Sequence, residues 1–98
     1  MQEVLPSRRR RRLLRPKNTV APAITGTAAV GQTLTVSNGT WTNTPLSYTY
    51  SWNGTGTATG NTYVVVAGDV GRRIICTVRA SNAKGPGYRD SAPTAVVV

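Results

Sequence analysis

The chain has 98 residues, enough for one domain, and carries a net charge of +9 from 12 Lys and Arg against 3 Asp and Glu. A single cysteine excludes an internal disulfide, and the absence of histidine leaves no set of zinc ligands. We therefore expect no metal and no other cofactor.

The positive charge is concentrated at the start of the chain. Residues 1–17 hold seven basic side chains against one acidic side chain, 7 − 1 = +6, whereas the rest of the chain carries +3. Blocks of like charge repel one another and often act as interaction tails, so we predict a flexible arm over residues 1–18 and a folded domain over 19–98. The residues expected to bind a partner are Arg8, Arg9, Arg10, Arg11, Arg12, Arg15 and Lys17.

The arm does not have the pattern of an export signal. Only Leu13 and Leu14 follow the arginines before Arg15, whereas a secretory signal needs about 7–15 apolar residues. No apolar run approaches the roughly 20 residues of a membrane span. Because the chain starts with Met and finishes on an apolar segment, we expect one complete module, and the lack of an export signal or membrane span favours a protein made in the cytoplasm.

Beyond the arm, short β-type segments alternate with turn residues. In chain order we predict strands at 21–25, 32–37 and 47–52, the last with strict apolar–polar alternation. Trp41 follows a turn, and the glycine-rich stretch 53–61 is expected to be a flexible connection.

The second half of the chain continues this pattern. Strands are predicted at 62–66, 72–81 and 88–98, with a turn at 67–71 and a hairpin loop at 82–87. About seven strands with a central tryptophan predict an all-β, two-sheet sandwich. The core is expected to contain Leu34, Val36, Trp52, Ile74, Cys76 and Val78.

Several stretches, "PAITGTAAVGQTLTVSNGTW", "YTYSW", "AGDVGRRIICTVRASNAKG" and "SAPTAVV", resemble the immunoglobulin-like domains of bacterial surface proteins and phage structural proteins. The resemblance implies an immunoglobulin-like β-sandwich with Trp52 in the core of strand C and Cys76 on strand F. Leu34 and Val36 stand where the disulfide partner of Cys76 would lie, so the core must hold by packing alone.

Other motifs favour ordinary structural roles. Cys76 has no histidine as base, and Asp69 and Asp90 are too few and too separated for acid–base catalysis, so we expect no enzyme activity. Asp69 is expected to bond the backbone of its turn. The "NGT" stretches at Asn38 and Asn53 are interpreted as turns rather than glycosylation sites.

The surface of the domain offers weaker candidates for binding. Trp41 and Tyr88 are the aromatic residues expected to be exposed as surface contacts. A basic face is a further hypothesis, although solvated strand positions are the favoured interpretation. Its residues would be Arg72, Arg73, Arg79 and Arg89.

These features together favour a phage virion accessory protein, most simply a capsid decoration protein held on the head by its arginine-rich arm. The expected partner is the major capsid protein or another acidic virion protein, bound by many copies, and the expected location is the virion. The alternatives are a tail or neck adhesion module and a nucleic-acid-binding protein that uses the arm. A membrane is the partner that the sequence favours least.

Overall fold

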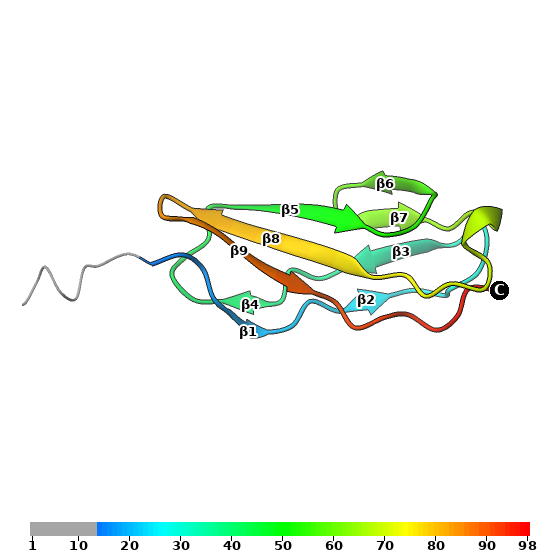
Figure 1. The fold of residues 1–98 in the computed structure, drawn as a ribbon, viewed down its shortest axis with the longest axis horizontal. Coiled ribbons are helices and arrows are strands. Elements are labelled where there is room, and N and C mark those ends of the chain that lie inside the picture. Colours follow the sequence, from blue (N-terminus) through cyan, green and yellow to red (C-terminus); the bar gives the residue numbers. More distant parts are fainter. Residues whose placement is uncertain (1–13) are drawn as a thin grey trace, which may run out of the picture.

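The computed structural model describes residues 14–98. The arginine run Arg8–Arg12 lies outside the described residues. Nine short strands and one 3₁₀ turn make up the described part (Figure 1). The elements are β1 (Asn18–Val20), β2 (Ile24–Thr25), β3 (Thr33–Val36), β4 (Thr40–Trp41), β5 (Ser47–Trp52), β6 (Thr57–Thr59), β7 (Thr62–Val64), η1 (Ala67–Asp69), β8 (Cys76–Asn82) and β9 (Gly85–Asp90).

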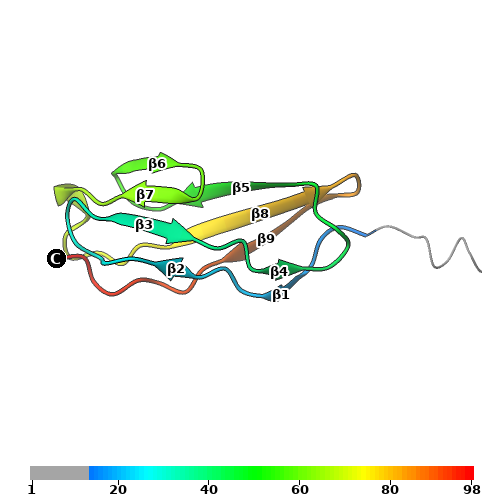
Figure 2. The ribbon, with the colours of Figure 1, turned by 180° about the vertical axis from the view of Figure 1, so that it is seen from behind.

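The strands form three antiparallel sheets. Four strands pair in the order β2-β3-β7-β6, three in the order β5-β8-β9, and β1 pairs with β4. Views from the front and from behind show the two larger sheets as separate layers (Figures 1 and 2). The all-β class is therefore confirmed, and the arrangement is consistent with a β-sandwich.

The strands with the clearest alternation form where they were predicted. β3 and β5 lie within the predicted segments 32–37 and 47–52. β8 pairs with β5 from Trp52–Cys76 to Ser47–Ser81 without a bulge. It starts later than predicted because Ile74 N bonds to the Thr94 hydroxyl (3.0 Å) rather than to a neighbouring strand.

Four predictions of local structure were wrong. The predicted strand 88–98 ends at Asp90, the last residue of β9, and beyond it Val96 forms only an isolated bridge with Arg73. The segment 21–25 is no continuous strand, because the buried Pro22 separates β1 from β2 and has no N–H to donate. The stretch 53–61 contains β6, an edge strand. The segment 82–87 is mostly strand, with a turn of only two residues between β8 and β9.

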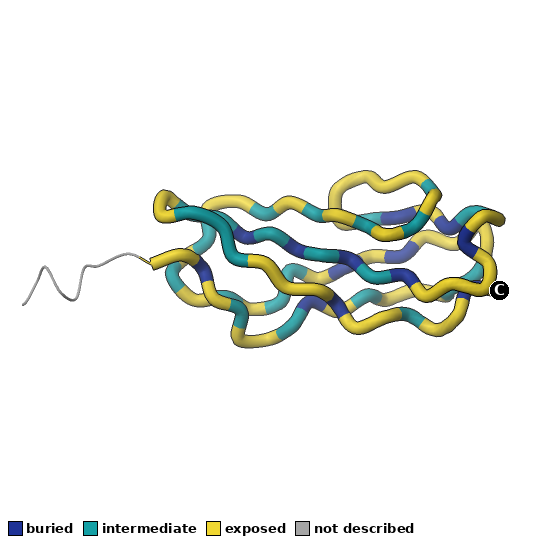
Figure 3. Tube along the Cα trace, viewed as in Figure 1, coloured by how far each residue is buried: buried dark blue, intermediate teal, exposed yellow. Residues whose placement is uncertain are grey.

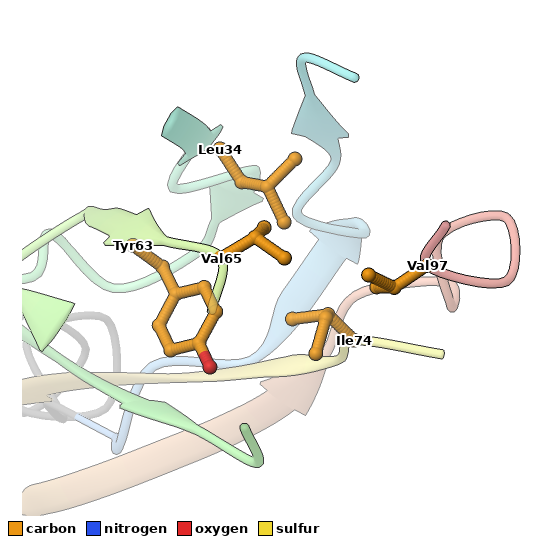
Figure 4. Packing of buried hydrophobic residues seen from close by; sticks show 5 residues of the cluster. All are labelled: Leu34, Tyr63, Val65, Ile74 and Val97. Atoms are coloured by element: carbon orange, nitrogen blue, oxygen red, sulfur yellow. The ribbon is translucent and has the colours of Figure 1, made fainter. Parts of the chain in front are cut away.

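The core lies between the two larger sheets (Figure 3). One cluster gathers at the end of the molecule near the C-terminus, where five side chains converge (Figure 4): Leu34, Tyr63, Val65, Ile74 and Val97. The second cluster consists of Val36, Cys76 and Val78. All of the expected core residues except Trp52 are thus fully buried.

Trp52 differs from the expected core tryptophan because it is only half-buried. Its indole stacks on Tyr63 with ring centroids 5.3 Å apart, and its Nε1 donates to Gly60 O (3.1 Å). It contacts both clusters. Tyr63 occupies the buried centre instead, because its hydroxyl finds polar partners inside the protein.

Candidate partner-binding surface

The predicted arm joins the domain at residues 14–17, which we call the arm root. Asn82 Nδ2 donates to Leu14 O (2.8 Å), and Asn43 Nδ2 donates to Arg15 O (2.9 Å). Both asparagines lie far along the chain from the arm root. This part of the predicted flexible arm is therefore docked on the domain, which corrects the arm boundary at residue 18.

The docking continues through Pro16 and Lys17. Thr42 N donates to Lys17 O (2.9 Å), and Lys17 N donates to the Thr42 hydroxyl (3.2 Å). Pro16 is buried, and its carbonyl lies so close to Gly87 that a Cβ on this glycine would be 2.1 Å from the oxygen. Glycine at position 87 is thus required for the arm root to lie on β9.

The loop that grips the arm root has an unusual backbone. Asn43 has φ 61° and Thr44 has φ 47°, in the left-handed region that β-branched residues rarely adopt. Asn82 Nδ2 donates to Asn43 O (2.7 Å) and helps to hold this conformation. Such conformations persist only where surrounding contacts fix them, and they cluster at functional sites.

Basic side chains gather around the arm root. Arg15 and Lys17 are exposed, and Lys84 is exposed in the turn between β8 and β9. The stem of Arg15 passes over Gly85, where a Cβ would lie 2.9 Å from Arg15 Cδ. The backbone of this segment is therefore held while its cationic groups face solvent.

Acidic groups hardly offset this charge. Residues 14–98 contain seven Lys and Arg against two Asp, 7 − 2 = +5. Asp69 is buried, and Asp90 accepts a hydrogen bond from the Thr77 hydroxyl (2.5 Å). A positive surface of this kind attracts polyanions and acidic proteins in a salt-dependent way.

The two candidate aromatic contacts differ in the structure. Tyr88 is 62% exposed, and its hydroxyl accepts a hydrogen bond from Arg79 Nε (3.3 Å). Trp41 is half-buried, packs against the second core cluster and donates from Nε1 to Asn38 O (2.7 Å). The expectation of an exposed Trp41 was wrong, because its ring covers the core under β4.

The four domain arginines do not form one basic face. Arg72 donates to Asn53 O (3.5 Å), and Arg73 donates to Thr94 O (3.0 Å). Both precede β8, whereas Arg79 lies within β8 beside Tyr88. Arg89 is exposed on β9.

Asp69 has a larger role than a bond to its own turn. Its Oδ1 accepts from Thr55 N (2.9 Å) and the Thr55 hydroxyl (3.1 Å). Its Oδ2 accepts from the Tyr63 hydroxyl (2.5 Å) and, as predicted, from a turn amide, Val66 N (3.2 Å). Burial favours a higher pKa of the carboxyl, but these hydrogen bonds outweigh it and lower the pKa.

The Tyr63 hydroxyl links Asp69 to the glycine-rich segment. It accepts from Gly56 N (2.6 Å), and a Cβ on Gly54 would lie 1.9 Å from it. Burial and the bond to Asp69 raise the pKa of Tyr63. The segment predicted to be flexible is therefore fixed to the core, and an isolated aspartate in the sequence gave no signal of this network.

The remaining candidates have structural contacts. Asn38 Oδ1 accepts from the Tyr50 hydroxyl (2.5 Å), and Asn53 Oδ1 accepts from Ile75 N (2.9 Å). Within residues 14–98, no group of three or more His, Cys, Asp or Glu side chains gathers where a metal ion would bind. In the same range no helix has the length and apolar character to cross a membrane.

Cys76 is predicted to be chemically silent in the folded protein. It is fully buried, and burial raises the pKa of its thiol to about 11. Since the thiolate is the reactive form, we expect a thiol reagent such as DTNB to label the native protein at least 100-fold more slowly than the protein in 6 M guanidinium at pH 8. Rapid stoichiometric labelling of the native protein would contradict this prediction.

Comparisons with known proteins identify no relative: no family model, curated protein or solved structure gives a significant match.

Proposed function

We propose that the domain is an immunoglobulin-like β-sandwich. The support is the strand order: β2-β3-β7-β6 and β5-β8-β9 follow the ABED and CFG sheets of the constant-type immunoglobulin fold, with β8 as strand F. Cys76 then lies on strand F, where it is a free, buried thiol. The β1–β4 pair is an addition to that order.

We propose further that the protein is an accessory structural protein of a phage virion, anchored on the head by its arginine-rich arm. The observation that carries this proposal is the docked arm root. Asn43 and Asn82 hold the backbone of residues 14–17 while the basic side chains of this segment remain exposed. A tail that serves only solubility does not require its root to be docked on the domain.

The docked arm root lowers the entropy cost of binding. Binding to a partner is weaker when flexible segments must become ordered on it. The arm root avoids this cost because the domain already holds it in one conformation. The arginines of residues 8–12 then form charge-assisted, often bidentate, bonds with carboxylates on the partner. An acidic groove between subunits of the capsid shell would supply such carboxylates.

The proposal is tested with purified particles from the producing culture. Replacing Arg8–Arg12 by glutamine, or deleting residues 1–13, is expected to reduce co-sedimentation with the particles at least 100-fold at 0.15 M salt. The truncation stops at residue 13 because residues 14–17 are bonded to the domain. For a control of equal charge, replacing Arg8 and Arg9 by glutamine is compared with replacing Arg72 and Arg73, which lie at the opposite end near Val96. The first pair should weaken binding, and the second should leave it unchanged.

Different outcomes separate the alternatives. Binding retained after the arginine replacement would refute the anchoring role. Immunogold label on tails rather than heads would move the function to host contact and make Tyr88 the residue to mutate. Tight DNA binding at physiological salt would favour the nucleic-acid function. In that case the slope of the logarithm of the binding constant against the logarithm of the salt concentration should correspond to about six neutralised phosphates.

A further inference from the structure

Strand β5 has one open edge. It is hydrogen-bonded to β8 on one side, and no strand within residues 14–98 pairs with its other side. The bond from Asn53 N to Ile75 O (3.2 Å) fixes which residues face β8. Because backbone groups alternate in direction along a strand, those of Tyr48, Tyr50 and Trp52 point to the open edge.

The same residues carry aromatic side chains on the inner face of the sheet. Tyr48, Tyr50 and Trp52 are half-buried and pack on the second core cluster. Ser47, Thr49 and Ser51 alternate with them and are exposed on the outer face. A strand added to the edge would therefore satisfy these backbone groups and place its own alternate side chains beside the half-buried aromatic rings.

β5 lacks the features that usually protect an edge. Its six residues, Ser47–Trp52, contain no charge, proline or glycine, and its register shows no bulge. The other free edges differ. β2 and β6 have two and three residues, and β9 is flanked by Pro16 of the arm root.

We propose that β5 is a self-association surface, on which a second copy of this chain pairs antiparallel through its own β5. A two-fold axis at Tyr50 places Tyr48 opposite Trp52 of the second copy, so that the outward backbone groups of each strand meet. The two three-stranded sheets join into one sheet with the order β9-β8-β5-β5-β8-β9.

Charge favours a second copy as the occupant over a charged peptide. β5 is uncharged, so it attracts neither acidic nor basic strands, whereas its alternating aromatic residues complement themselves. The net positive charge of the domain does not prevent pairing. Arg79 lies on β8, and the two β8 strands would be three strand spacings, about 14 Å, apart, beyond the Debye length of about 8 Å at physiological salt.

Sedimentation equilibrium of the full chain from 10 µM to 1 mM tests the proposal. We expect a monomer–dimer equilibrium with a dissociation constant on the order of 100 µM, because one strand pair buries less than a standard interface. Replacing Thr49 and Ser51 together by lysine should weaken it about tenfold or more, since position 49 of one copy lies opposite position 51 of the other. A chain that stays monomeric at 1 mM overturns the proposal.

The control variant carries the same added charge elsewhere. Thr33 and Thr35 are exposed on β3, so replacing both by lysine should leave the dissociation constant unchanged. Equal weakening by both variants would indicate a general charge effect and overturn the assignment to β5. Unchanged association of the Thr49→Lys, Ser51→Lys variant would also overturn it.

A charge exchange tests the pairing itself. The variant with Thr49 and Ser51 replaced by glutamate should form a heterodimer with the lysine variant more tightly than either associates with itself. A synthetic peptide of residues 47–52 should compete for the same edge. If the peptide binds while copies of the chain do not associate, the edge accepts a free strand but not the β5 strand of a second folded copy, and self-pairing is refuted.

Discussion

Replacing Asp69 by alanine is expected to lower the free energy of unfolding by about 3–5 kcal/mol. The change leaves the buried Tyr63 hydroxyl without its acceptor, which costs about 1–3 kcal/mol, and it removes the part-buried, charge-assisted bonds from Thr55 N and Val66 N, which contribute about 1.5–3 kcal/mol between them. In a domain of this size the loss corresponds to a fall in Tm of roughly 15–30 °C. Thermal unfolding followed by circular dichroism measures it.

The control for this prediction is Asp90→Ala. Asp90 is exposed and loses only the bond from the Thr77 hydroxyl, so its effect is expected to stay within about 0.5 kcal/mol. A similar effect of the two substitutions would show that the carboxyl network does not hold the glycine-rich segment.

The same network predicts an acid limit for stability. The pKa of Asp69 is lower in the folded than in the unfolded protein, so the unfolded state binds more protons as the solution is acidified. The stabilisation by Asp69 is present above about pH 4, the unfolded pKa, and is lost as the pH falls through the folded pKa. Urea unfolding of the protein and of the Asp69→Asn variant should therefore converge towards pH 2.

Gly87→Ala is expected to release the arm root from the domain. Its methyl group would lie 2.1 Å from Pro16 O, and the backbone of β9 is held by its pairing with β8. Overpacking of this kind costs about 1–3 kcal/mol. The specific readout is trypsin cleavage of the Lys17–Asn18 peptide bond. This cleavage should become at least tenfold faster, because Thr42 no longer holds the backbone of Lys17 through its two hydrogen bonds.

Gly60→Asn provides the comparison. Gly60 has φ 57° and open space around its Cα, a conformation that asparagine tolerates. Its cleavage after Lys17 should match that of the unchanged protein. Unchanged cleavage in Gly87→Ala would mean that the close approach of Pro16 does not position the arm root.

Sequence reasoning predicted the β class and the strands with strict alternation. In β5 and β8 every second side chain is apolar or aromatic, and this period of two is a local signal. It fails for β6, whose residues Thr57–Thr59 are all exposed. This strand forms by antiparallel pairing with β7, and the adjacent Gly56 N bonds to the Tyr63 hydroxyl, a contact that composition does not reveal.

The candidate site was predicted less completely. Charge alone marked Arg15 and Lys17 as partner-binding residues, but the docking of the arm root depends on Thr42, Asn43 and Asn82. Those asparagines lie 28 and 68 residues from the groups they bind, and no local pattern connects them. Non-local side-chain bonds to backbone are therefore the part of this site that only the fold reveals.

The opposite placement of the arm root and the C-terminus has a practical consequence. The C-terminus lies at the end of the long axis remote from the arm root (Figure 1). Val97 is buried and Val98 N donates to Ala28 O (3.0 Å), so the chain is held to its last residue. A peptide fused after Val98 would start from a fixed point at the far tip, so the domain would act as a rigid spacer between the arm root and the fused peptide.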